Sequence, residues 1–89
     1  NTKIVDVIKA LADYGIQITI YDPWANPVEV QREYNLITTT TLPIESFDAV
    51  VLGVSHTVFL DLDFSLLQHE KSLLYDVKGI LGDRADGRL

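Results

Sequence analysis

The sequence predicts an α/β fold, in which a parallel β-sheet has helices on both faces. Residues 49–54 form an apolar run interrupted only by Gly53, and a strand that is apolar at every position is typical of the middle of a parallel sheet. Helical and strand patterns also alternate along the chain, which favours parallel strands joined by right-handed crossovers. The 89 residues, 47% of them apolar, are enough for one small folded domain.

The N-terminal part of the chain shows a helix pattern followed by a strand pattern. Apolar residues recur at helical spacing over residues 3–14, with Thr2 as the expected N-cap and Gly15 as the left-handed residue after the helix. Isoleucines alternate with polar residues over 16–21, and Pro23 ends this strand. An α/β unit ordinarily opens with a strand, so we expect the first strand of the sheet to lie upstream of this chain.

The later elements follow in the same alternating order. They are a helix from the Asn26 cap to about Tyr34 ended by Asn35, a short strand at 36–38, the apolar strand, a short helix over 64–69 capped by Asp63, and a strand at 72–77. The predicted architecture is a three-layer, Rossmann-like parallel sheet. Residues 1–82 are expected to form the domain, and residues 83–89 a mobile polar tail.

Composition argues against several classes of function. A net charge of −6 disfavours a nucleic-acid surface, which needs clustered lysine and arginine. The absence of cysteine excludes a disulfide scaffold, a thiolate metal site and a cysteine nucleophile within these residues. Two distant histidines without patterned carboxylates argue against a metal site. No apolar run is long enough for a membrane span and no signal peptide is visible, so we expect a cytoplasmic protein.

The end of the apolar strand is the first candidate site. Ligands of open α/β sheets bind where the strands end at their carboxyl edge. Here that edge carries Ser55 and His56, which we expect to lie at the rim of a binding crevice. The alternative for His56 is a ring satisfied by the local backbone.

Five segments in order resemble one known family. They read N-T-K-I-V-D-V-I-K-A-L (1–11), Y-D-P-W-A (21–25), E-V-Q-R-E-Y-N (29–35), F-D-A-V-V-L-G-V-S-H-T-V-F (47–59) and Y-D-V-K-G-I-L (75–81). Together they resemble the C-terminal, UDP-binding domain of the UDP-glucose/GDP-mannose dehydrogenases. The D-P-W-A and D-x-K-G variants are most similar to the branch that oxidises UDP-N-acetylhexosamines for polysaccharide synthesis.

The resemblance implies an NAD-dependent enzyme that oxidises the C6 alcohol of a UDP-sugar to a carboxylate. Two hydride transfers, with a cysteine thiohemiacetal between them, are implied for the whole enzyme. The present chain contains neither a G-x-G-x-x-G fingerprint nor a cysteine, so NAD and the catalytic cysteine are expected in upstream domains. The chain itself would be non-catalytic and would contribute half of the UDP-sugar cleft. Its implied partners are those N-terminal and central domains and further copies of the enzyme in a homo-oligomer.

The resemblance also suggests which residues contact the substrate. Lys78 follows the last strand, in a turn where relatives carry arginines that touch the nucleotide sugar, and it could bind the diphosphate. Gly79 stands at the second basic position, so a solvated surface lysine is the alternative. Ser55 and His56 would bond the base, ribose or phosphate. Phe59 could pack against the uracil, although a core position is the favoured interpretation.

Three further residues have competing interpretations. Trp24 is an interface candidate, or a lid over the sheet edge. Asp22 could bind a ribose in an NAD-binding half-domain, but turn formation before Pro23 is favoured. His69 is expected to be a solvated helix end.

A ligand-free, flavodoxin-like regulatory module is the other alternative function, although its phosphoacceptor form needs an aspartate after the central strand.

Overall fold

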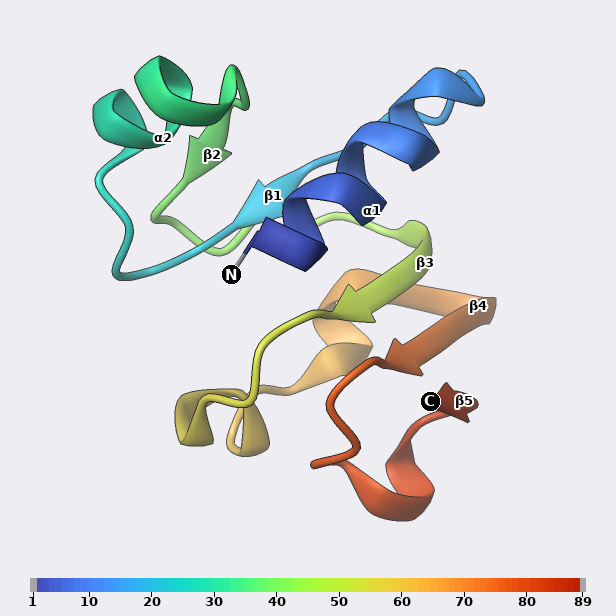
Figure 1. Ribbon diagram of the computed structural model, residues 1–89. Helices are drawn as coiled ribbons and strands as arrows, with labels where there is room; N and C mark the ends of the chain where they lie inside the picture. Colours follow the sequence, from blue (N-terminus) through green and yellow to red (C-terminus); the bar gives the residue numbers. More distant parts are fainter. Residues whose placement is uncertain (1, 89) are drawn as a thin grey trace. The chain divides into compact units, whose positions relative to one another are not determined.

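A computed structural model describes residues 2–88 and divides the chain into two compact units, Asn1–Pro43 and Ile44–Leu89. We call them the N-terminal and C-terminal units and describe each by itself (Figure 1). Every strand pair in both units is parallel, and the α/β class is therefore confirmed. None of the helices in the described part of the chain is long and apolar enough to cross a membrane.

The N-terminal unit contains two helices and a two-stranded sheet. Its elements are α1 (Thr2–Asp13), β1 (Ile20–Tyr21), α2 (Pro27–Tyr34) and β2 (Thr38–Thr39), with β1 paired to β2. The prediction of α1 is confirmed, but Thr2 is its first residue instead of its cap. Gly15 has the expected positive φ of 82°, which glycine adopts without steric cost. The strand predicted over 16–21 is reduced to two residues, because β2 offers only two partners for backbone pairing.

The ends of α2 follow the sequence closely. Asn26 caps the helix, since its side-chain oxygen accepts hydrogen bonds from the N–H groups of Val28 at 2.9 Å and Glu29 at 3.4 Å. Asn35 ends it in the left-handed conformation, with φ 57°, and its N–H donates to the carbonyl of Gln31 at 2.9 Å. Both caps satisfy backbone groups that have no partner inside the helix.

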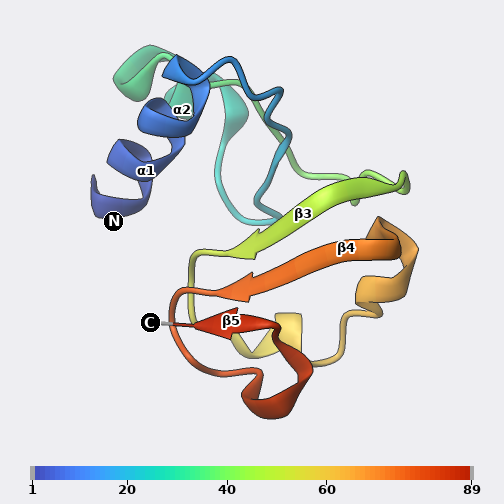
Figure 2. The same ribbon diagram turned by 90° about the vertical axis from the view of Figure 1, so that its right-hand side faces the viewer.

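The C-terminal unit is a three-stranded parallel sheet with short 3₁₀ turns (Figure 2). Its elements are β3 (Phe47–Leu52), η1 (Thr57–Leu60), η2 (Phe64–Leu67), β4 (Gln68–Asp76), η3 (Gly82–Arg84) and β5 (Gly87–Arg88). The strand order is β3-β4-β5, so β4 is the middle strand. The apolar run was expected to occupy that place with both faces covered, and this expectation is wrong within the unit. Val51 remains 45% exposed, whereas its neighbour Leu52 is buried.

The core of the C-terminal unit lies on one face of this sheet. Leu52 and Leu74 reach it from β3 and β4, and the turns and loops add four further apolar side chains: Phe59, Phe64, Leu67 and Leu81. On the other face of the two strands, Val51, Leu73 and Tyr75 are at least one-third exposed. Alternation along each strand explains this difference, since successive side chains point to opposite faces.

The segment around Asp63 differs from its predicted helix. Asp63 does cap a turn, because its carboxylate accepts hydrogen bonds from the hydroxyl and the N–H of Ser65. Both bonds lower the pKa of this carboxyl, and the bond from the hydroxyl has the larger effect. However, the turn is the 3₁₀ element η2, and β4 already begins at Gln68. The prediction of a helix up to residue 69 is therefore wrong. Pairing of Gln68 with Phe47 of β3 stabilises the strand conformation there.

The last strand lies in the segment for which the sequence predicts a polar tail. β5 pairs with β4, placing Gly87 opposite Tyr75. Just before it, the N–H of Asp86 donates to the carbonyl of Leu74 at 2.7 Å, and the Asp86 carboxylate accepts from the N–H of Leu74 at 2.7 Å. These bonds join the end of the chain to the middle strand.

Candidate functional site

The carboxyl edge of the C-terminal sheet is the candidate site. Leu52 and Asp76, the last residues of β3 and β4, are paired in register. Directly beyond them, the N–H of Val77 donates to the carbonyl of Leu52 at 3.0 Å. The loops that follow the two strands therefore leave the sheet side by side (Figure 2). One carries Ser55 and His56 and the other carries Lys78, so the structure brings these predicted site residues to the same edge.

Ser55 and His56 are exposed on the first of these loops. His56 has extended backbone angles and precedes η1 as its N-cap, where its Nδ1 accepts a long hydrogen bond of 3.5 Å from the N–H of Val58. Accepting at Nδ1 leaves Nε2 as the protonated nitrogen of the neutral ring. One nitrogen of the ring thus accepts a hydrogen bond from the local backbone, and the other, Nε2, carries a hydrogen and is a hydrogen-bond donor.

Phe59 follows the same loop but points into the core. It is only 7% exposed and belongs to the apolar cluster of the C-terminal unit. This burial favours the core interpretation over contact with a ligand.

The second loop is a turn organised by Asp76. This residue is fully buried. One carboxylate oxygen accepts from the N–H groups of Lys78 at 3.2 Å and Gly79 at 2.9 Å, and the other accepts from the N–H of Leu81 at 2.8 Å. Asp76 therefore shapes the turn. Lys78 lies exposed on it, where a cation can meet an anionic ligand.

Asp22 and Trp24 belong to the N-terminal unit. The Asp22 carboxylate accepts hydrogen bonds from the N–H groups of Trp24 at 3.0 Å and Ala25 at 3.1 Å. This is the turn chemistry that the sequence favoured for Asp22. Trp24 is 55% exposed, which suits a side chain that contacts another domain or subunit.

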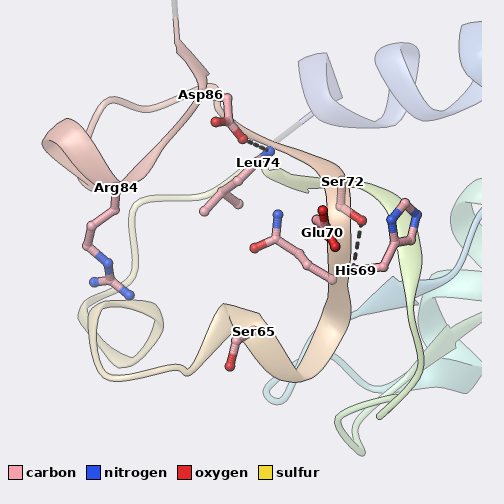
Figure 3. A pocket seen from close by; sticks show the side chains of 8 residues that line it. Ser65, His69, Glu70, Ser72, Leu74, Arg84 and Asp86 are labelled. Atoms are coloured by element: carbon pink, nitrogen blue, oxygen red, sulfur yellow. Dashed lines mark hydrogen bonds between the residues drawn. The ribbon is translucent and has the colours of Figure 1, made fainter.

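A pocket of about 480 Å³ near the start of β4 was not predicted (Figure 3). It is lined by Ser65, Gln68, His69, Glu70, Ser72, Leu74, Arg84 and Asp86. Two of its charged groups form hydrogen bonds within the fold. The Arg84 guanidinium donates to the carbonyls of Leu60 at 2.8 Å and Leu62 at 3.2 Å, and the Asp86 carboxylate accepts from the N–H of Leu74. No spacing in the sequence marks this pocket, because Arg84 and Asp86 are distant in the chain from the other lining residues and reach them only in the folded unit.

His69 lines this pocket from β4 and does not lie at a helix end, so its predicted position is wrong. Its Nε2 is 2.8 Å from a carboxylate oxygen of Asp48, and its Nδ1 accepts from the N–H of Lys71 at 3.2 Å. The Ser72 hydroxyl donates to the carbonyl of Phe47 and accepts from the N–H of His69. These bonds close an irregularity in the register between β3 and β4. No group of three or more His, Asp or Glu side chains within residues 2–88 could hold a metal ion.

A parallel α/β unit with polar and cationic side chains where adjacent strands end is typical of nucleotide-binding domains. The family described as "UDP-glucose/GDP-mannose dehydrogenase family, UDP binding domain" matches residues 1–83. The chain belongs to this family.

Individual relatives agree with this assignment. The chain is 36% identical to the UDP-N-acetyl-D-glucosamine 6-dehydrogenase of Salmonella typhi and 33% identical to that of Pseudomonas aeruginosa, with all of the chain aligned to 22% of each relative. It is 28% identical to protein CapL of Staphylococcus aureus, over 91% of the chain and 20% of the relative. The chain thus spans about a fifth of the length of these relatives. No solved structure gives a significant match.

Proposed function

We propose that this chain is the UDP-binding domain of an NAD-dependent dehydrogenase that oxidises the C6 alcohol of a UDP-N-acetylhexosamine to a carboxylate for polysaccharide synthesis. The observation that carries the proposal is the shared carboxyl edge, where Lys78 and the Ser55-His56 pair lie on adjacent loops of a domain from this family. The names of the two UDP-N-acetyl-D-glucosamine 6-dehydrogenases support the choice of sugar nucleotide.

In this proposal the chain binds the substrate and does not react with it. The Lys78 ammonium offers a charge-assisted hydrogen bond to a diphosphate oxygen. Ser55 can donate or accept through its hydroxyl, and His56 can donate through Nε2, to the ribose or base. Because the chain has a net charge of −6, attraction of an anionic substrate depends on such local cations and not on the overall field.

The residues of this chain do not fit an NAD site. Asp22 is the single candidate that the sequence offered for the ribose, and its carboxylate is used in the turn before α2. When bound, NAD would accept the hydride from the sugar carbon, and we assign its binding and the catalytic cysteine to other domains of a longer protein. We assign contacts with those domains and with further copies of the protein to the exposed Trp24. We propose the cytoplasm as the compartment.

A phosphoacceptor module receives no support from the geometry. The middle strand β4 does end in an aspartate, Asp76. However, this carboxylate is fully buried and both its oxygens accept backbone hydrogen bonds. A phosphoryl donor needs an accessible carboxylate oxygen, so Asp76 does not suit that role.

The direct test uses the full polypeptide encoded by the gene that contains this chain. We expect NADH to form when the protein receives NAD and UDP-N-acetylglucosamine, with two NADH per sugar because an alcohol is oxidised to a carboxylate. Absorbance at the NADH band measures the reaction, and GDP-mannose serves as the control nucleotide sugar. Absence of NADH with every UDP-sugar tested would contradict the proposed function.

Replacing Lys78 with alanine in that protein is expected to raise the KM for the UDP-sugar about tenfold, the size of one lost charged hydrogen bond. The KM for NAD should stay unchanged, because the turn lies in the UDP-binding domain. Steady-state kinetics with each substrate varied in turn gives both constants. Lys71→Ala is the matched control, since this exposed lysine lies near the start of β4. An unchanged KM for the UDP-sugar would remove Lys78 from the site.

A further inference from the structure

The turn that carries Lys78 is built around a buried charge. Asp76 is the last residue of the middle strand and its side chain is fully buried. Its two carboxylate oxygens accept three backbone N–H groups within the next five residues, those of Lys78, Gly79 and Leu81. Among the described side chains, no lysine or arginine forms an ion pair with this carboxylate. The three backbone N–H groups therefore offset the free-energy cost of removing the Asp76 carboxylate from water.

These hydrogen bonds decide which groups of the turn remain for a ligand. Successive N–H groups in a tight turn often bind phosphate. Here the N–H groups of Lys78, Gly79 and Leu81 already point to the Asp76 carboxylate. Three N–H groups of the turn are therefore not available to an anion, and the Lys78 ammonium is the positive charge that this turn offers.

The same bonds fix the place from which that side chain starts. Asp76 is held in the sheet opposite Leu52, and Leu81 at the far end of the turn is 5% exposed in the core. Gly79 between them has a φ of 74°, a left-handed conformation that glycine adopts at little cost. The Lys78 backbone is thus held between two buried residues while its side chain is exposed.

We propose that Asp76 is a positioning residue for the UDP-sugar, which acts by holding Lys78 at the carboxyl edge where the diphosphate binds. This inference rests on the proposed function of Lys78. A lysine side chain is flexible, so a fixed backbone restricts the volume that its ammonium group explores. Asp76 itself does not touch the substrate.

Asp76→Asn tests the requirement for a carboxylate at nearly constant volume. An amide has one acceptor oxygen and one NH₂ donor, so it cannot accept from both sides of the turn. At least one of the three N–H groups would face a donor, and the turn has to rearrange. We expect the KM for the UDP-sugar to rise about tenfold, since small misplacements of a binding group have effects of this order or larger.

A double-mutant cycle in the full-length protein separates positioning from general damage. The variants are Asp76→Asn, Lys78→Ala and the combination, assayed with UDP-N-acetylglucosamine and NAD varied in turn. If Asp76 acts through Lys78, the effect of Asp76→Asn on the UDP-sugar KM should shrink to less than about twofold once Lys78 is absent. An undiminished effect in the Lys78→Ala background would overturn the inference.

Two further variants keep the test decisive. Asp86→Asn is the matched control, because this carboxylate also accepts a backbone N–H, that of Leu74, in the same sheet; its UDP-sugar KM should stay at the wild-type value. Gly79→Ala strains the turn at positive φ without a clash, since no atom lies within 4 Å of an added Cβ. Gly79→Ala replaces Asp76→Asn in the cycle if the latter variant does not fold. It should raise the KM for the UDP-sugar when Lys78 is present and leave it unchanged in the Lys78→Ala background.

The outcomes also distinguish this inference from the proposed function. A Lys78→Ala variant with an unchanged KM for the UDP-sugar would overturn the positioning role, while wild-type activity with a UDP-sugar would leave the proposed function intact. A wild-type protein that oxidises no UDP-sugar would contradict the proposed function itself.

Discussion

Replacing Phe64 with alanine is expected to lower the free energy of unfolding by about 3–5 kcal/mol. Phe64 is only 7% exposed, and its ring lies 5.5 Å from the guanidinium carbon of Arg84. Alanine would leave a cavity in a core with few large side chains, and neighbouring groups fill such a cavity only partly. It would also remove the ring over which the Arg84 guanidinium is placed. Urea denaturation followed by circular dichroism measures the change.

Leu66→Ala is the matched control for this prediction. Leu66 lies in the same 3₁₀ turn, η2, but is 47% exposed. Its truncation should cost less than about 1 kcal/mol, because much of the side chain is already in water. Equal losses for the two variants would contradict the assignment of Phe64 to the core.

Replacing Asp76 with alanine should lower the free energy of unfolding by roughly 3 kcal/mol, or about 1 kcal/mol for each of the three N–H groups left without an acceptor. The residue is fully buried, so water cannot replace the carboxylate without opening the turn. Urea denaturation gives the loss, and an unchanged denaturant slope would show that the unfolded state is unaffected. Hydrogen exchange of the Lys78, Gly79 and Leu81 amides should accelerate more than that of other amides in the sheet.

Asp83→Ala removes the same charge from an exposed position in η3. It should change the free energy of unfolding by no more than about 0.5 kcal/mol. If Asp76→Ala is as mild as this control, or if exchange of the three amides does not accelerate, the Asp76 carboxylate does not hold the turn.

The local elements could be predicted because their signals lie within a few residues of one another. Asn26 and Asn35 mark both ends of α2, and the structure confirms both caps. Asp22 and Asp63 accept hydrogen bonds from N–H groups two or three residues later. Such bonds depend on side-chain geometry near the backbone and need no distant partner.

The sheet could be predicted only in part, because strand pairing joins distant residues. The apolar run of 49–54 indicated a middle strand, yet β4 occupies that place in the C-terminal unit. His69 has helical neighbours in the sequence pattern, but pairing with β3 puts it in β4 beside Asp48. β5 forms where a polar tail was predicted, since Leu74 supplies backbone partners to Asp86.

The candidate site shows the same division between local and distant information. The sequence by itself determined the α/β class, the caps of α2 and the candidates Ser55 and His56, because each follows from composition or from neighbouring residues. It also offered Lys78, through the family resemblance of the turn that carries it. Only the tertiary structure decided that Leu52 and Asp76 end in register, so that these candidates share one edge. It also decided that Phe59 is buried and that Asp76 is enclosed by three N–H groups. Burial and strand register depend on contacts between residues that are distant in the chain, and such contacts cannot be predicted from the local sequence.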